Sequence, residues 1–158
     1  MTRPAKGRVE VRRRIDASPE TVFSYFTDPA KYRKWQGVEA ELDPRPGGVF
    51  RVTVTGRTRH VASGTFIEVD PPTRLVFTWG WEPADTLPEG QVELPPGSST
   101  VEVVLVPDGS ATLLHLVHGD LPTEPACRMH TWGWELTLDR LVIAAAGNDP
   151  GPDLLATL

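Results

Sequence analysis

The chain has 158 residues, a formal net charge of -5, 39% hydrophobic and 23% charged residues, and one cysteine, Cys127. These values are typical of one globular domain, and they exclude a disordered charged tail, an internal disulfide and metal sites built on paired cysteines. The net acidity and the lack of a long apolar run or a signal-peptide core predict a cytoplasmic protein that neither binds nucleic acid nor spans a membrane.

The first element expected is a strand over residues 9–15, in which apolar and charged residues alternate. Arg13 breaks the alternation because it falls on the apolar face. We expect its guanidinium to pair with Glu135 or Asp139 of the last predicted helix. The alternative is that Arg13 faces an anionic ligand in a cavity.

Two helix starts follow this strand. The Ser-Pro-Glu motif at residues 18–20 predicts a helix whose first turn is capped by the serine hydroxyl. The Asp-Pro pair at residues 28–29 predicts a second short helix that runs to Trp35. Gly37 is expected to end it.

After Gly37 the hydrophobic period is two for about eighty residues, which predicts antiparallel strands. The apolar faces indicate strands over residues 50–54, 60–69, 75–81, 101–105 and 114–118, with a tight hairpin turn at residues 107–110. The segment 83–98 has four prolines, two glycines and no periodicity. We expect a loop there, with weak internal hydrogen bonding and a position near the mouth of a cavity.

A long helix near residues 123–146 is the last element, because large apolar residues recur there at helical spacing and Gly147 follows. The fold class is therefore α+β: a strand, two short helices, further strands and one long C-terminal helix. A curved antiparallel sheet of about six or seven strands can wrap around that helix. Such a sheet and helix do not pack tightly along their whole length, so we expect a cavity between them.

Several segments, in this order and spacing, resemble the heat-shock-protein-90 ATPase activator homologue family of the START-like (SRPBCC, helix-grip) superfamily. The resemblance extends from Val9 to Ala146. The segments that carry it are residues 16–23 (DASPETVF), 27–29 (TDP), 43–50 (DPRPGGVF), 68–72 (EVDPP), 75–79 (LVFTW), 99–103 (STVEV) and 116–119 (LVHG).

The resemblance implies a helix-grip fold and a cavity rather than a particular reaction. Related proteins are similar to the birch-pollen allergen and to lipid-transfer START domains, which bind hydrophobic small molecules. On this basis residues 1–158 form one START-like domain, with a core over about residues 9–146 and a C-terminal tail over residues 147–158.

Large aromatic residues are numerous for a small core of one sheet and one helix. Most of them are expected to pack, but Trp79, Trp81 and Trp134 also have N–H groups that need partners when buried, which suits the wall of a partly wet pocket. The residues predicted to line the ligand cavity are Trp35, Phe50, Phe66, Trp79, Trp81, His118, His130 and Trp134.

The histidines and the cysteine do not form a recognisable metal or nucleophile motif. His115 and His118 lie three residues apart on a predicted strand, so their side chains are expected on opposite faces. No paired-cysteine or HExxH spacing occurs. Cys127 is interpreted as a small buried hydrophobe. We therefore predict no metal, no cofactor and no catalytic residue.

The function predicted from these observations is the binding of an unknown hydrophobic or aromatic small molecule between the sheet and the last helix. One alternative is a cavity enzyme of the cyclase or dehydratase type, in which His118, His130 or Glu135 acts as acid or base. Another is a protein that regulates a chaperone through its surface, in the manner of heat-shock-protein-90 ATPase activators. The sequence leaves a homodimer open.

Overall fold

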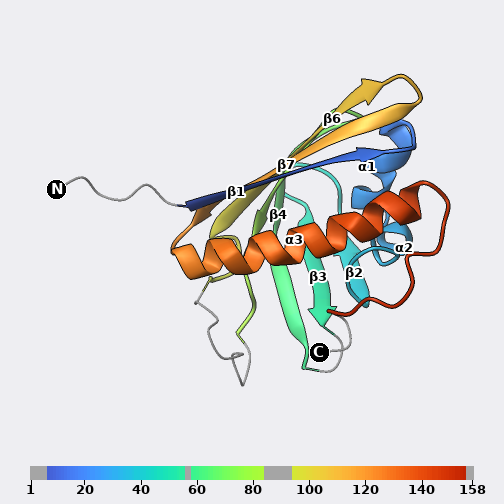
Figure 1. The fold of residues 1–158 in the computed structure, drawn as a ribbon. Helices are drawn as coiled ribbons and strands as arrows, with labels where there is room; N and C mark the ends of the chain where they lie inside the picture. Colours follow the sequence, from blue (N-terminus) through green and yellow to red (C-terminus); the bar gives the residue numbers. More distant parts are fainter. Residues whose placement is uncertain (1–6, 56–57, 84–93, 156–158) are drawn as a thin grey trace.

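The computed structural model describes residues 7–55, 58–83 and 94–155. Its main element is a seven-stranded antiparallel sheet with the strand order β1-β7-β6-β5-β4-β3-β2. The elements are β1 (Gly7–Ile15), α1 (Pro19–Thr27), α2 (Pro29–Tyr32), β2 (Glu39–Leu42), β3 (Val49–Thr55), β4 (His60–Asp70), β5 (Arg74–Trp79), β6 (Ser99–Asp108), β7 (Ala111–Leu121) and α3 (Glu124–Ala145). The long helix α3 lies across one face of the sheet, with α1 and α2 near its C-terminal end (Figure 1). The predicted helix-grip fold is confirmed.

Both predicted helix starts are present. The Ser18 hydroxyl accepts a hydrogen bond from the Thr21 amide, and the Asp28 carboxylate accepts from the amide of Ala30. The predicted extent of the second helix is wrong, since α2 ends at Tyr32 and the chain continues to Gln36 in hydrogen-bonded turns.

The chain turns after α2 because it must pass close to β3. Gly37 has a φ of +79°, and a Cβ there would lie 2.6 Å from the carbonyl oxygen of Thr53. Glycine is therefore required at this position, both for its conformation and for the space it leaves.

The strand β2 was not among the predicted strands. It is a four-residue edge strand paired with β3, and the side chains of Glu39 and Glu41 are exposed. Short, charged edge strands lack the apolar alternation by which strands are recognised, and their charges discourage pairing with a further chain. This explains why the pattern of the sequence did not reveal it.

The strand predicted to reach Trp81 ends instead at Trp79. Gly80 packs against the backbone of Pro95, and a Cβ at Gly80 would overlap the carbonyl oxygen of Pro95. The chain leaves the regular strand at this contact, and Trp81 then forms an isolated bridge with Ala62 of β4.

The loop predicted over residues 83–98 falls partly outside the described residues, because 84–93 are not among them. At its C-terminal end the described residues are bonded mainly to residues outside the segment. The amide of Trp81 donates to Leu94 O at 2.7 Å, and the amide of Gly97 donates to Ser63 O at 3.1 Å. Leu94 is buried, so this end of the segment is fixed to the sheet by backbone bonds and by packing.

The helix α3 is held at its middle by an ion pair and at its end by the tail. Arg13 Nε donates to Asp139 Oδ1 at 2.8 Å, which confirms the predicted pairing of Arg13 with the last helix. Arg140 donates to the carbonyl oxygens of Trp35, Gly151 and Pro152 at 2.8–3.2 Å. These bonds dock the tail beside α2. None of the helices in the described residues is long and apolar enough to span a membrane.

Candidate functional site

Three tryptophans and two histidines meet between the sheet and α3, and we call this group the Trp–His cluster. Trp79 ends β5, Trp81 follows it, His118 lies on β7, and His130 and Trp134 occupy one face of α3. The Trp79 ring centroid is 5.1 Å from that of Trp134 and 5.5 Å from that of Trp81, and the two histidine rings are 4.8 Å apart. Helical spacing of four residues places His130 and Trp134 on the same face.

His118 is held by a chain of hydrogen bonds that fixes its tautomer. Trp134 Nε1 donates to His118 Nδ1 at 3.0 Å, so Nδ1 is the acceptor nitrogen of the ring. His118 Nε2 therefore carries the proton and donates to Ser99 Oγ at 2.8 Å. The Ser99 hydroxyl in turn donates to the carbonyl oxygen of Trp79 at 2.6 Å. Each side-chain polar atom of Trp134, His118 and Ser99 in this series of hydrogen bonds has a partner.

His130 has the opposite tautomer. Its Nδ1 lies 2.7 Å from the carbonyl oxygen of Ala126 and donates to it, because a carbonyl can only accept. His130 Nε2 is then the acceptor, and it receives the Trp81 Nε1–H at 3.3 Å. Each histidine of the cluster thus accepts one indole N–H.

Each histidine accepts a hydrogen bond at one ring nitrogen, which only the uncharged imidazole can do. Burial lowers the pKa of His118 well below its ordinary value, and the neighbouring His130 lowers it further. Burial also lowers the pKa of His130, against the opposing effect of its hydrogen bond to Ala126 O. The exposed fractions of their side chains, 0% for His118 and 4% for His130, explain why the charged forms are disfavoured.

The indole N–H of Trp79 differs from the others in the cluster. Trp79 is 2% exposed, yet its Nε1 has no hydrogen-bond acceptor among the described residues. Only one other buried side-chain nitrogen in the described part of the chain lacks a partner, His60 Nε2, and it lies outside the cluster. Buried polar groups in proteins nearly always have a partner, so an open donor at this place requires an explanation.

The three remaining predicted cavity residues lie beside the cluster or one ring further away. Phe50 stacks on Phe77 with a centroid distance of 4.1 Å and lies 5.8 Å from Trp79. Phe66 meets Phe50 edge to face at 5.7 Å. Trp35 is fully buried, and its N–H donates to the carbonyl oxygen of Tyr25 at 2.9 Å. Its own hydrogen-bonding need is therefore met within the core.

Ser99 is a member of this site that sequence reasoning missed. It lies on the same face of β6 as the buried Val101 and Val103, two and four residues further along the strand. This alternation along β6 is the pattern from which the inward position of Ser99 could have been predicted. A small polar residue at the start of an apolar face has no pattern of its own, so its role became visible only through its contacts with His118 and Trp79.

Comparison with known proteins identifies the family to which this chain belongs. The family model of Activator of Hsp90 ATPase homolog 1-like protein matches residues 16–146. The chain belongs to this family. Comparison of the sequence with curated proteins finds no match.

Solved structures of similar proteins agree with this membership. An AHSA1-like protein from Rhizobium etli is 42% identical over 100% of this chain and 94% of its own, with a TM-score of 0.70. CalU16 from Micromonospora echinospora is 31% identical over 89% of this chain and 76% of its own, with a TM-score of 0.68. A protein from Chromobacterium violaceum, 23% identical over 92% of this chain and 98% of its own with a TM-score of 0.72, shares the fold.

The other residues considered for chemistry, His115, Glu135 and Cys127, lie outside the Trp–His cluster. His115 lies on the face of β7 opposite to His118, as predicted from their spacing, and contacts Glu10 at 3.2 Å. Glu135 is exposed. Cys127 is half-buried rather than buried, and it packs against the edge of the core. Among residues 7–55, 58–83 and 94–155, no three His, Cys, Asp or Glu side chains come together as a metal site would require.

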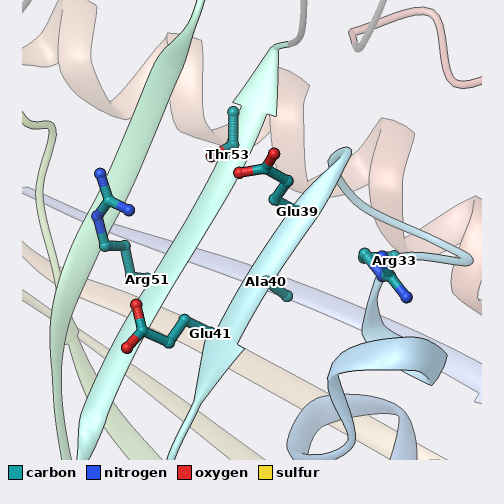
Figure 2. A pocket seen from close by; sticks show the side chains of 6 residues that line it. All are labelled: Arg33, Glu39, Ala40, Glu41, Arg51 and Thr53. Atoms are coloured by element: carbon teal, nitrogen blue, oxygen red, sulfur yellow. The ribbon is translucent and has the colours of Figure 1, made fainter.

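A surface pocket of about 290 Å³ lies on the other face of the sheet, and none of the predicted site residues line it. Figure 2 shows its lining side chains, which are Arg33, Glu39, Ala40, Glu41, Arg51 and Thr53. Arg51 is engaged by Glu82 through two bonds of 2.6 and 2.9 Å. A depression lined by carboxylates and paired charges does not suit an apolar ligand.

Proposed function

We propose that this protein binds a small apolar or aromatic molecule at the Trp–His cluster, between the sheet and α3. One observation carries the proposal: the N–H of Trp79 is buried beside the rings of Trp81 and Trp134 and has no acceptor among the described residues. Binding sites for small molecules combine aromatic walls with a few polar groups that are left for the ligand. The helix-grip fold of the family supports this location.

The hydrogen bonds of the two histidines favour binding over acid–base catalysis. A cyclase or dehydratase would need a histidine nitrogen directed at the substrate. Both ring nitrogens of His118 and both of His130 are engaged within the protein. The exposed Glu135 lies away from the buried cluster.

The proposal predicts that replacing Trp134 by alanine weakens binding. The substitution removes the indole that forms one wall of the cluster, so the affinity for an apolar aromatic ligand should fall by at least about tenfold, as expected for the loss of about 1.4 kcal/mol or more of contact. Stability should fall by about 3–5 kcal/mol, because Trp134 is a buried core residue. Isothermal titration calorimetry with a panel of aromatic and fatty-acid ligands measures the first effect, and urea unfolding measures the second.

Trp132→Ala is the matched control. Trp132 lies two residues away on α3 and is 55% exposed, so its removal should leave both affinity and stability close to those of the wild type. The proposal is abandoned if the folded wild-type protein binds no member of the panel.

A further inference from the structure

We propose that Trp79 Nε1 is the hydrogen-bond donor that selects the ligand, and that the ligand offers it a neutral oxygen acceptor such as a ketone or quinone carbonyl. This inference rests on the proposed function and makes it specific. Trp79 is then the residue that hydrogen-bonds to the polar part of the ligand, and that part is a neutral oxygen.

All but one of the N–H donors in the described cluster have an acceptor within the protein. The N–H groups of Trp81 and Trp134 are donated to His130 and His118. The histidine N–H groups are donated to Ala126 O and Ser99 Oγ, and the serine hydroxyl is donated to the carbonyl of Trp79. Among the described residues of the cluster, the Trp79 N–H alone remains open. A ligand at this place therefore completes the network by accepting a hydrogen bond.

The described surroundings of the Trp79 N–H offer no positive charge to a ligand. The cluster itself contains no cation, because each histidine ring accepts an indole N–H at one nitrogen, as only a neutral imidazole can. The guanidinium of Arg51 lies on the other face of the sheet and is paired with Glu82, and that of Arg13 is paired with Asp139. A carboxylate brought to the cluster would lose its water and receive one neutral N–H in return, which does not offset the cost of burying a charge. A neutral oxygen loses far less on leaving water, so the acceptor is neutral.

The Trp79 ring is flanked by the rings of Trp81 and Trp134. The Trp79 ring lies at 83° to Trp81 and at 50° to Trp134, with centroid distances of 5.5 and 5.1 Å. Rings at these centroid distances are in direct contact with one another, so a ligand reaches the Trp79 N–H by packing against the indoles, and flat rings make the stacked or edge-to-face contacts that indole favours. The inferred ligand is thus a flat aromatic molecule with a neutral carbonyl oxygen.

Matched ligand pairs test this inference on the wild-type protein. 9-Fluorenone and fluorene have the same tricyclic skeleton and differ in having a carbonyl or a methylene group, and 1-indanone and indane form a smaller pair. Calorimetry should show each ketone binding about fivefold more tightly than its hydrocarbon, the gain expected from one hydrogen bond in place of water. Fluorene-9-carboxylate should bind more weakly than either tricyclic partner.

The indole signals of the five tryptophans give a second measurement. In a ¹H–¹⁵N correlation spectrum, the Nε1–H signal of Trp79 should move on addition of 9-fluorenone in a manner that fluorene does not reproduce. The signal is assigned by its absence from Trp79→Phe. In that variant the preference for the ketone should fall to about onefold, because phenylalanine keeps a flat ring but has no donor. Trp132→Phe, the same change at an exposed position, should keep the full preference.

The outcomes separate the two proposals. If neither pair binds to the wild type, the proposed function fails and this inference fails with it. If the ketones and hydrocarbons bind equally well, the proposed function stands and the role of the Trp79 N–H is overturned. Tighter binding of the carboxylate than of 9-fluorenone overturns the neutral acceptor, and a ketone preference that survives Trp79→Phe overturns the assignment to Trp79.

Discussion

Ser99 shows how a single hydroxyl can organise the centre of this protein. It accepts a hydrogen bond from His118 Nε2–H and donates one to the carbonyl of Trp79, and thereby links β7 to the end of β5. The same link keeps the His118 ring in the tautomer that accepts the Trp134 N–H. A buried residue of this kind contributes mainly by leaving no polar group without a partner.

Replacing Ser99 by alanine should therefore destabilise the protein. The substitution leaves the His118 N–H and the Trp79 carbonyl without their present partner, and an unsatisfied buried polar group costs about 1–3 kcal/mol. The free energy of unfolding in urea measures the effect. Ser98→Ala is the control, because Ser98 is exposed and keeps its backbone bond to Pro95 O. Equal unfolding midpoints for the two variants would show that the network contributes nothing to stability.

At the scale of elements, two glycines that look alike in the sequence have opposite roles. Gly80 ends β5 where the backbone of Pro95 presses against it. Gly133 lies inside α3, and a Cβ placed there would meet no other atom within 4 Å. The first glycine is required by a tertiary contact. The second only increases the backbone freedom of the unfolded chain, which the helix must then lose on folding.

Alanine at these two positions should therefore change stability in opposite directions. Gly133→Ala should raise the free energy of unfolding by about 0.5–1 kcal/mol, since alanine loses less backbone entropy in a helix. Gly80→Ala should lower it by about 1–3 kcal/mol, because the chain near Pro95 must move to admit the methyl group. Thermal unfolding followed by circular dichroism distinguishes the two. A stabilised Gly80→Ala variant would mean that the contact with Pro95 relaxes at little cost.

At the scale of the whole molecule, the sheet order brings distant segments into one core. The first strand, β1, pairs with the last strand, β7. The helix α3 follows β7 in the chain and lies across one face of the same sheet (Figure 1). The buried histidines are contributed by β7 and α3, so their burial depends on the docking of the helix. Their protonation is consequently coupled to global unfolding.

Acid should destabilise the protein in the range where histidines titrate. The folded-state pKa values of His118 and His130 are lowered, whereas in the unfolded chain both have a pKa of about 6.5. The unfolded state therefore binds more protons below about pH 6.5, so stability is complete above that pH and falls as the pH decreases. Each histidine should contribute a slope of up to about 1.4 kcal/mol per pH unit.

Urea unfolding between about pH 7 and about pH 5 measures this slope. The pKa values of Glu10 and Glu82 are lowered by hydrogen bonds from His115 and Arg51, so these carboxylates lose their stabilising contribution at lower pH than the histidines. His115 lies on the outer face of β7, so the His115→Gln variant should lose as much free energy of unfolding on acidification as the wild type does. A free energy of unfolding that stays level across the range would contradict the neutral, buried state of the two histidines.

Local chemistry explains what could be predicted from the sequence alone. The serine and aspartate caps, the strand alternation and the helical spacing of His130 and Trp134 act between near neighbours in the chain, so they indicated the element order, the inward faces and the family. The charge of Arg13 on an apolar face was enough to predict a partner on the last helix, because a half-buried guanidinium needs one.

Tertiary structure alone decided the features that depend on residues far apart. The short strand β2 forms by pairing with the open edge of β3. The tail docks because Arg140 donates hydrogen bonds to its carbonyl oxygens. The tautomer of His118 follows from the approach of the Trp134 indole to its Nδ1, and the indole that meets His130 Nε2 comes from Trp81, 49 positions away in the sequence. The open N–H of Trp79 is likewise visible only in three dimensions, since a donor lacks a partner only by virtue of what surrounds it.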